Sequence, residues 1–332
     1  MEVRHHRSRA ERDAAISRGP PVNRKGRPRN IAASVRARLT QRARDRQENV
    51  QLALIRYAIE RLLYRLGLSS HREEFVLKGA MLFSLWAPTP YRSTGDLDLL
   101  GFGDPAPERI VSVFREICSL TAADDGVAFR PETIRAQAAR LEEEYSGIRL
   151  TLDAEIAGAR LPLQIDIGFG DVVTPGIQDI DYPSLLDMPL PHLRAYPPET
   201  VVAEKLQALA ALGLLNSRMK DFFDLWAISQ TFAFAGSTLV QAIQATFERR
   251  ATAIPPETPA ALTATFSNDP AKQAQWRGFL RRTSIALAPA PLPDLLHRIG
   301  DFVMPPLEAL RAGATFNKNW RPGGPWKIAE KE

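Results

Sequence analysis

The sequence predicts an α+β fold, in which a mixed β-sheet flanked by helices is followed by an α-helical C-terminal lobe. Before Pro183, apolar residues alternate with polar ones in several short runs, which is the spacing of half-buried strands. Beyond Pro183, apolar residues recur at helical spacing instead. At roughly 150 residues per domain, a chain of 332 residues predicts about two folded units. The predicted divisions are a basic arm at 1–30, helices plus a sheet domain at 31–190, a helical lobe at 191–311 and an irregular tail at 312–332.

The elements follow in order along the chain. Two helices are expected between Ile31 and Leu66, because their apolar residues recur every three or four positions. Pro197-Pro198 presets the first turn of a later helix that ends at Gly213. The other predicted elements are strands at 75–77, 96–100, 147–156 and 161–169, and helices at 81–86, 107–120, 218–232, 237–249, 271–285 and 291–311.

Composition restricts the class of protein. Apolar residues make up 45% of the chain and charged residues 24%, as in ordinary globular proteins. The single cysteine, Cys118, excludes an internal disulfide and a cysteine-rich zinc site, which favours a reducing cytoplasm. No uninterrupted apolar run approaches the roughly 20 residues of a membrane helix, and the charged N-terminus does not resemble a signal peptide. We therefore expect a cytoplasmic protein with no membrane partner.

Positive charge is concentrated at the N-terminus. Residues 1–46 hold fourteen Lys and Arg against four acids, a net charge of +10, so the rest of the chain carries −5. Pro20, Pro21 and Pro28 disfavour regular structure before residue 30. Such an arm attracts polyanions by counterion release and needs no folded site. A nucleic-acid contact is one interpretation, and a solvated leader or an arm that binds an acidic protein is the alternative.

The segment Asp96-Leu97-Asp98 is the most informative one for chemistry. Two carboxylates at i and i+2 of a strand project to the same side, with Cβ atoms roughly 6 to 7 Å apart. Each negative charge raises the pKa of the other, and a shared divalent cation removes that penalty. Oxygen ligands suit Mg²⁺ or Mn²⁺, which take their remaining ligands from substrate phosphates. Upstream, Gly79 opens a helix after a strand, where backbone N–H groups could approach a triphosphate.

Asp166 is the candidate for a third metal ligand. It stands in the otherwise apolar strand Leu163-Gln164-Ile165-Asp166-Ile167-Gly168, where an unpaired carboxylate would be costly. By itself, an Asp-x-Asp pair could also be an exposed strand edge. The sequence therefore predicts a metal site made of Asp96, Asp98 and Asp166.

A second group of charged residues lies in the helical half. Asp221 and Asp224 are three residues apart on a helix whose other residues are mainly apolar, so both acids can lie along one edge of it. Lys205 sits in the middle of another helix, among valine and leucine residues.

Taken together, the glycine turn, the Asp-x-Asp and the later strand Asp resemble the polymerase-beta-like nucleotidyltransferase superfamily. Four blocks are similar, in the same order, to the AbiEii/MenT-type nucleotidyltransferase toxins of type IV toxin–antitoxin systems, and the resemblance covers roughly residues 31 to 310. The blocks are Lys78-Gly79, Tyr91-Arg92-Ser93-Thr94-Gly95-Asp96-Leu97-Asp98, Val202-Ala203-Glu204-Lys205 and Arg218-Met219-Lys220-Asp221-Phe222-Phe223-Asp224-Leu225.

The resemblance implies a nucleotidyltransferase fold and assigns site residues. It implies Asp96, Asp98, Lys205 and Asp221 as catalytic residues. It implies Lys78, Gly79, Arg92, Thr94, Lys205, Lys220 and Asp224 as nucleotide-binding residues. Ala80 departs from the family pattern, which has a small Gly or Ser at that position.

The resemblance also implies the activity: a Mg²⁺-dependent transfer of a nucleotide from an NTP to RNA, with the tRNA 3′ end as the expected acceptor. It implies a toxin that an AbiEi-like antitoxin neutralises. Metal on Asp96 and Asp98 would neutralise charge as pyrophosphate leaves, Lys205 and Arg92 would stabilise the phosphates, and Asp166 or Asp221 could accept the hydroxyl proton. One alternative is a nucleotide- or RNA-binding module without turnover, and another is an enzyme that modifies a protein hydroxyl.

The histidines and tryptophans carry simpler predictions. The five histidines show no metal-ligand spacing. Trp276, Trp320 and Trp326 could stack on bases, but packing in the core or docking of the tail is favoured.

Overall fold

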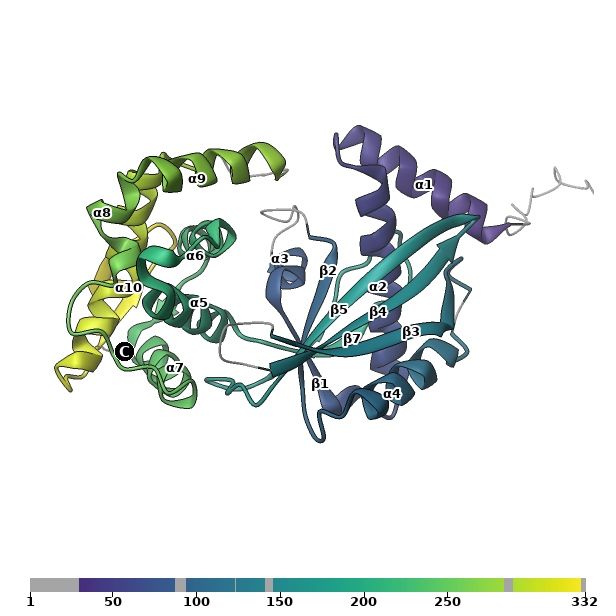
Figure 1. The fold of residues 1–332 in the computed structure, drawn as a ribbon, viewed down its shortest axis with the longest axis horizontal. Helices are drawn as coiled ribbons and strands as arrows, with labels where there is room; N and C mark the ends of the chain where they lie inside the picture. Colours follow the sequence, from purple (N-terminus) through teal and green to yellow (C-terminus); the bar gives the residue numbers. More distant parts are fainter. Residues whose placement is uncertain (1–29, 87–93, 123, 141–145, 284–288, 330–332) are drawn as a thin grey trace, which may run out of the picture.

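The computed structural model describes residues 30–86, 94–122, 124–140, 146–283 and 289–329. Residues 1–29 of the basic arm predicted at 1–30, and the candidate nucleotide-binding residue Arg92, lie outside this range. Figure 1 shows two lobes, one built on a β-sheet and the other built of helices α5 to α10. The α+β fold predicted from the sequence is therefore confirmed.

The described residues of the first lobe form a seven-stranded sheet in the order β3-β4-β5-β2-β1-β7-β6. Strand β2 runs parallel to β5 and β1 runs parallel to β7, whereas the other pairs are antiparallel, so the sheet is mixed as predicted. The strands are β1 Phe75–Lys78, β2 Asp96–Gly101, β3 Ala128–Arg140, β4 Ser146–Ile156, β5 Ala159–Phe169, β6 Gln178–Asp181 and β7 His192–Ala195.

Helices cover one face of this sheet. Helix α2 contacts β5, β7 and helix α4, and α4 contacts β3. Asn30 and Asn49 cap the first two helices, because their side chains accept hydrogen bonds from the backbone N–H groups of Ala33 and Leu52. The helical elements of this lobe are α1 Ile31–Asp45, α2 Val50–Leu68, α3 Leu82–Trp86, α4 Pro107–Ser119, and the short 3₁₀ helices η2 Arg72–Glu74 and η3 Gly79–Met81.

Alternation along the central strands decides which side chains face the helices. Leu163, Ile165 and Ile167 of β5 are buried beneath the helical layer, whereas Gln164 and Asp166 point to the opposite face. The candidate site residues therefore lie on the sheet face that α2 and α4 leave uncovered.

Two strand regions were not predicted. Strand β3 is an edge strand that contains three Arg, one Glu and one Gln, and it lacks the apolar alternation that reveals half-buried strands. Strands β6 and β7 have four residues each, which is too short for a periodic signal. Because β7 pairs with β1, the sheet extends to Ala195, past residue 190 where the sequence places its end.

The second lobe matches the helices expected beyond Pro183. Proline occupies the first turn of α5, α9 and α10, where its missing N–H costs nothing. None of the described helices combines the length and the apolarity that crossing a membrane requires. The helices are α5 Pro198–Leu212, α6 Met219–Thr231, α7 Gly236–Arg249, α8 Ala264–Ser267, α9 Pro270–Arg282 and α10 Leu292–Arg311, with 3₁₀ turns η4 Gly213–Leu215 and η5 Ala260–Leu262.

The C-terminal tail is more ordered than the irregular segment predicted from Ala312. Strands β9 Lys318–Trp320 and β10 Trp326–Ile328 join β8 Phe234–Ala235 in a three-stranded sheet. Trp320 is 3% exposed, and its indole Nε1 donates to the Ser229 carbonyl at 2.8 Å. The ring of Trp326 stacks on Phe302. These tryptophans pack as core residues, as favoured from the sequence, and they bind the tail to α6 and α10.

Candidate functional site

Four charged residues lie in one row across neighbouring strands of the sheet. Lys78 on β1 pairs in register with Asp98 on β2, and Asp98 pairs with Asp166 on β5. On the next strand, Arg149 of β4 pairs with Asp166. Residues directly opposite each other on adjacent strands share a face of the sheet. The row therefore places two acids between two cations on the face that the helices leave uncovered.

Gly79 brings the backbone close to the Asp98 carboxylate. Its φ of +72° lies in the left-handed region, which side chains rarely adopt. A Cβ added at this position would lie 2.0 Å from Asp98 Oδ2, so the carboxylate occupies the space that any side chain would need. The turn between β1 and η3 therefore requires glycine for two separate reasons.

Asp98 is a carboxylate in an unfavourable electrostatic setting. Burial raises its pKa, the cations of Lys220 and Lys78 lower it, and the acids Asp166 and Asp96 raise it, with a raised pKa as the net result. Asp96 stands at the exposed start of β2, two residues earlier and on the same face. A bound cation would relieve this repulsion, so the donor chemistry of the pair fits a hard divalent metal ion.

Asp166 is held by an arginine that sequence reasoning did not identify. Arg149 Nε and Nη2 donate to the two carboxylate oxygens of Asp166 at 2.8 and 2.9 Å, in the bidentate arrangement typical of strong pairs. Among the described residues, no three His, Cys, Asp or Glu side chains converge closely enough to hold a metal ion. In this structure Asp166 is thus paired with Arg149 and does not complete a three-acid cluster.

The sequence did contain a signal for Arg149. Strands β4 and β5 were both predicted, and only Ala157-Gly158 separates them. A two-residue hairpin turn fixes the register, so Ile156 pairs with Ala159, and counting back pairs Arg149 with Asp166.

The second group of charged residues forms a buried cluster between α5 and α6. Lys205 Nζ lies 2.7 Å from Asp221 Oδ1 and 2.9 Å from Asp224 Oδ2. Arg218 Nε lies 2.6 Å from the other oxygen of Asp221. Burial would raise the pKa of Asp221, but Lys205 and Arg218 outweigh it and lower the pKa to about 2. Two cations therefore balance two carboxylates that are almost fully buried.

Lys78 belongs to a different network, which joins the two lobes. Its Nζ donates to Asp171 at 2.9 Å and lies 3.9 Å from Glu204 of α5. Arg250, at the end of α7 and 2% exposed, contacts the same two acids at 3.1 and 3.4 Å. Burial would lower the pKa of Lys78, but Glu204 and Asp171 outweigh it and raise the pKa. Sequence reasoning did not identify Asp171 or Arg250 as members of this network, because the two lie 79 residues apart and meet only through tertiary structure.

These elements meet at a cavity of about 100 Å³ between the lobes. Its walls combine the glycine turn and Asp98 of the sheet with Lys205 in the middle of α5 and with Arg218 and Lys220 at the start of α6. Six of the residues predicted from the sequence line it: Lys78, Gly79, Asp98, Lys205, Lys220 and Asp221.

The other predicted residues lie around this cavity. Asp224 contacts Lys205 at the buried side of the α5–α6 cluster. Asp96 is exposed at the start of β2, and Thr94 is half-buried two residues before it. Asp166 is one strand further along the row, paired with Arg149.

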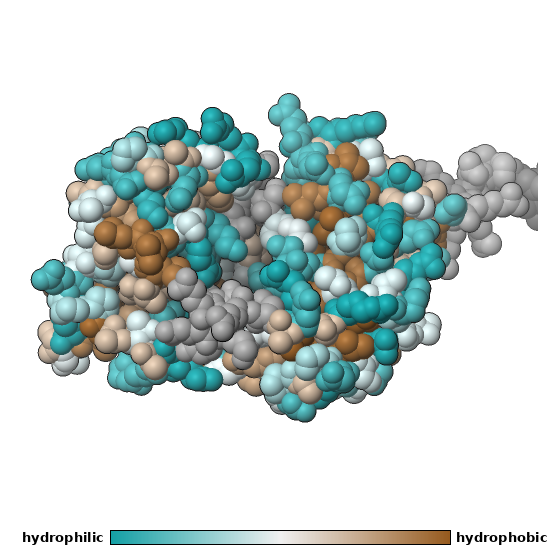
Figure 2. Space-filling model, viewed as in Figure 1, coloured by the Kyte–Doolittle hydropathy of each residue, from teal (hydrophilic) through white to brown (hydrophobic). Residues whose placement is uncertain are grey.

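A larger hollow of about 610 Å³ lies between α6 and α9 and shares Arg218 and Lys220 with the cavity. Arg282 adds a third cation, and no carboxylate is among the described residues that line it. In the space-filling view of Figure 2, the surface is notched between the two lobes, with hydrophilic residues on both rims at the upper end. The catalytic candidates therefore adjoin a positively charged hollow.

Comparison with known proteins identifies the family. Residues 61–301 match the family described as nucleotidyl transferase AbiEii toxin, Type IV TA system. No curated protein matches the chain. Two crystal structures from Helicobacter pylori are similar to it, each with a TM-score of 0.47. JHP933 shares 13% identity over 80% of this chain and 95% of its own, and a candidate nucleotidyltransferase shares 12% identity over 81% of this chain and 100% of its own. Since the family match spans more than half of the sequence, the chain belongs to the AbiEii nucleotidyltransferase toxin family.

Proposed function

We propose that this nucleotidyltransferase uses Mg²⁺ or Mn²⁺ to transfer a nucleotide from an NTP to an RNA acceptor, with the tRNA 3′ end as the expected acceptor. The observation that carries the proposal is the cavity in which Gly79 and Asp98 of the sheet face Lys205, Lys220 and Asp221 of the helical lobe. Asp98 comes from the sheet lobe, whereas Lys205 and Lys220 come from the helical lobe, so the cavity depends on both. As in other type IV toxins, an antitoxin would neutralise the protein, and we propose one of the AbiEi type.

The carboxylates are proposed to hold the metal ion. Asp96 and Asp98 share one face of β2, and burial, together with Asp166 and Asp96, raises the pKa of Asp98 although Lys220 and Lys78 lower it. Asp166 is the proposed third ligand, in register with Asp98. A divalent ion at this position supplies charge neutralisation on the phosphates of the substrate.

The cations of the helical lobe are proposed to bind the phosphates. Lys220 is exposed at the start of α6 and close enough to lower the pKa of Asp98, so its ammonium faces the metal-binding acids. Lys205 is fixed by Asp221 and Asp224, which set the position of its ammonium group in the cavity wall. Gly79 lets the backbone of the turn lie against the Asp98 carboxylate, next to the proposed metal ion and the phosphates that it would bind. A positioned cation stabilises the charge that develops on the leaving pyrophosphate.

Asp221 is better suited to positioning than to proton transfer. A carboxyl group with a pKa of about 2 holds a proton weakly, so it is a poor general base near neutral pH. We therefore assign Asp221 to holding Lys205 and Arg218. Of the two carboxylates that the sequence offers as proton acceptors, Asp166 is therefore the one that we propose.

Support for an RNA acceptor comes from charge. The hollow between α6 and α9 presents Arg218, Lys220 and Arg282 beside the cavity, and a polyanion gains affinity by displacing counterions from such a surface. Phe279, half-buried in the same wall, offers a ring on which a base could stack. An acceptor end threaded through this hollow would reach the phosphates in the cavity.

The test is incorporation of label. Purified protein is incubated with total tRNA, Mg²⁺ and each labelled NTP in turn, beside the Asp98→Asn variant and Asp187→Asn, a control whose side chain is 98% exposed. We expect label on RNA with the parent and the control, and none with Asp98→Asn. Label that survives RNase on protein would instead identify a protein acceptor. Binding of NTP or RNA with no incorporation in any reaction would support the binding-module alternative.

A metal titration tests the role of Asp166. If Asp166 is a ligand, Asp166→Asn raises the Mg²⁺ concentration for half-maximal activity by roughly ten-fold or more. If Asp166 serves only as the partner of Arg149, the metal requirement stays at the parental value while thermal stability falls.

A further inference from the structure

A second basic cavity lies within the first lobe, among α1, α2, α3 and the segment 182–185. Its volume is about 140 Å³, and its cationic wall consists of Arg42 of α1, Arg46 directly after that helix and Arg56 of α2, while Glu60 of α2 also lines it. None of its lining residues lines the cavity at Gly79. We propose that this cavity is a binding site for a phosphate group, separate from the nucleotide site.

Charge is the first argument for an anion. Two nearby acids already form ion pairs with other arginines: Glu48 lies 3.4 Å from Arg56, and Glu60 lies 2.6 Å from Arg61. No carboxylate of the described residues lies within ion-pair distance of the Arg42 or Arg46 side chains. The cavity therefore retains two positive charges that the described part of the protein does not pair.

The environment of Arg42 agrees with this excess. Its side chain is half-buried, and its pKa is lowered first by burial and then by the charge of Arg46; Arg56 acts in the same direction, and Glu48 and Glu60 act in the opposite one. Arg42 and Arg46 repel each other, and a bound anion would relieve that repulsion. Guanidinium groups match phosphate oxygens with paired hydrogen bonds, which makes phosphate the anion of choice for such a cluster.

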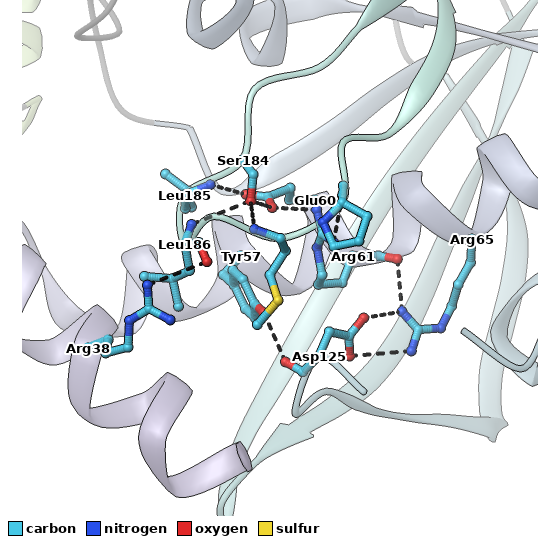
Figure 3. Close-up of polar contacts among 11 residues, drawn as sticks. Arg38, Tyr57, Glu60, Arg61, Arg65, Asp125, Ser184, Leu185 and Leu186 are labelled. Carbon is cyan, nitrogen blue, oxygen red and sulfur yellow. Dashed lines mark hydrogen bonds and ion pairs between the residues drawn. The ribbon is translucent and has the colours of Figure 1, made fainter. Parts of the chain in front are cut away.

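The wall opposite the arginines is fixed in advance. Figure 3 shows the Glu60 carboxylate, 1% exposed, reaching the segment that closes the cavity. It accepts hydrogen bonds from Ser184 Oγ and from the Leu185 backbone N–H, both at 2.8 Å. Nearby, Tyr182 donates its hydroxyl to the Met81 carbonyl at 3.1 Å. A wall held by buried hydrogen bonds needs little reorganisation when a ligand binds, which favours affinity.

Size is compatible with a phosphate group, because a cavity of about 140 Å³ has room for one. Arg46 is exposed at its edge, so the rest of the ligand can remain outside. The phosphate could belong to an RNA backbone or to a free polyphosphate, and the experiment distinguishes these sources.

The cavity also adjoins the catalytic turn. Met81 and Ser84, which line it, belong to η3 and α3, and η3 begins at Gly79. A phosphate bound here lies behind the turn that presents Gly79 to the nucleotide site. The proposal does not rest on the identity of the acceptor, because the free-polyphosphate measurement involves no transfer reaction.

The test compares two double variants of the full chain. Arg42→Gln/Arg46→Gln removes the two unpaired cations, whereas Arg38→Gln/Arg44→Gln removes the same charge from helix α1 outside the cavity. Arg56 is left intact because it is buried and ion-paired. Binding of tripolyphosphate is measured by calorimetry and binding of tRNA by filter retention at two salt concentrations. Circular dichroism checks that both variants are folded.

We expect Arg42→Gln/Arg46→Gln to bind one or both probes at least ten-fold more weakly than the matched control does. Loss confined to tRNA, with a salt slope smaller by about two, assigns the site to RNA phosphates. Loss confined to tripolyphosphate assigns it to free phosphates, and loss of both means that it accepts either source. Equal affinities of the two double variants for both probes would overturn the proposal. If the parent protein transfers no nucleotide but the two double variants still differ in binding, the proposed function is refuted and the phosphate site is supported.

Discussion

Replacing Asp221 by Asn tests how strongly the buried cluster between α5 and α6 stabilises the fold. The carboxyl group has a pKa of about 2 in the folded protein, against 3.8 for an ordinary Asp, because Lys205 and Arg218 overcome the effect of burial. A pKa that is lower in the folded state stabilises the protein above pH 4, and this stabilisation is lost as the pH falls through 2. The difference corresponds to about 2 kcal/mol at pH 7, and about half of it remains at pH 3.

Urea unfolding at pH 7 and pH 3 measures this contribution. We expect Asp221→Asn to lower the free energy of unfolding by about 2 kcal/mol or more at pH 7, and the gap to the parent to narrow by about 1 kcal/mol at pH 3. Asp187→Asn serves as the control, because that carboxylate is almost fully exposed and its partner Arg38 is also on the surface. A gap for Asp221→Asn that is the same at both pH values would show that the reasoning about its charge is wrong.

Three further predictions follow from the site and the tail. Asp98→Asn should lower activity roughly a hundred-fold or more. It should also raise the melting temperature at pH 7, and raise it less at pH 4. The reason is that the pKa of Asp98 is raised in the folded state, so ionisation of this carboxyl group opposes folding as the pH rises. Gly79→Ala should lower the free energy of unfolding by roughly 1 to 2 kcal/mol or more, because the left-handed backbone at this position disfavours any side chain. Gly176→Ala is the control for the same thermal melts and should be near neutral, because the space around Gly176 is open. Trp320→Ala should lower the free energy of unfolding in denaturant by about 3 to 5 kcal/mol, because the ring is buried and its N–H donates to the Ser229 carbonyl. An unchanged unfolding midpoint would mean that the tail does not stabilise the helical lobe.

The sequence by itself determined the fold class and most of the central elements. The alternation around Asp98 and Asp166 predicted β2 and β5, and helical spacing predicted α5 to α7, because burying one face of an element leaves a periodic apolar pattern. It also determined the family, since the charged blocks stand in a fixed order along the chain. Strands β3 and β7 left no such pattern, as one is a polar edge and the other has four residues.

Only the tertiary structure decided which charges neutralise which. Lys78 and Arg250 each pair with Asp171 and Glu204, and these four contacts join residues up to 126 positions apart along the chain. Local patterns record which face of an element is buried, but they do not record its distant partners. The pairing of Arg149 with Asp166 is a tertiary contact that the sequence could have predicted. The two-residue turn between β4 and β5 fixes the register of these strands, so the partner of Asp166 can be counted along the sequence.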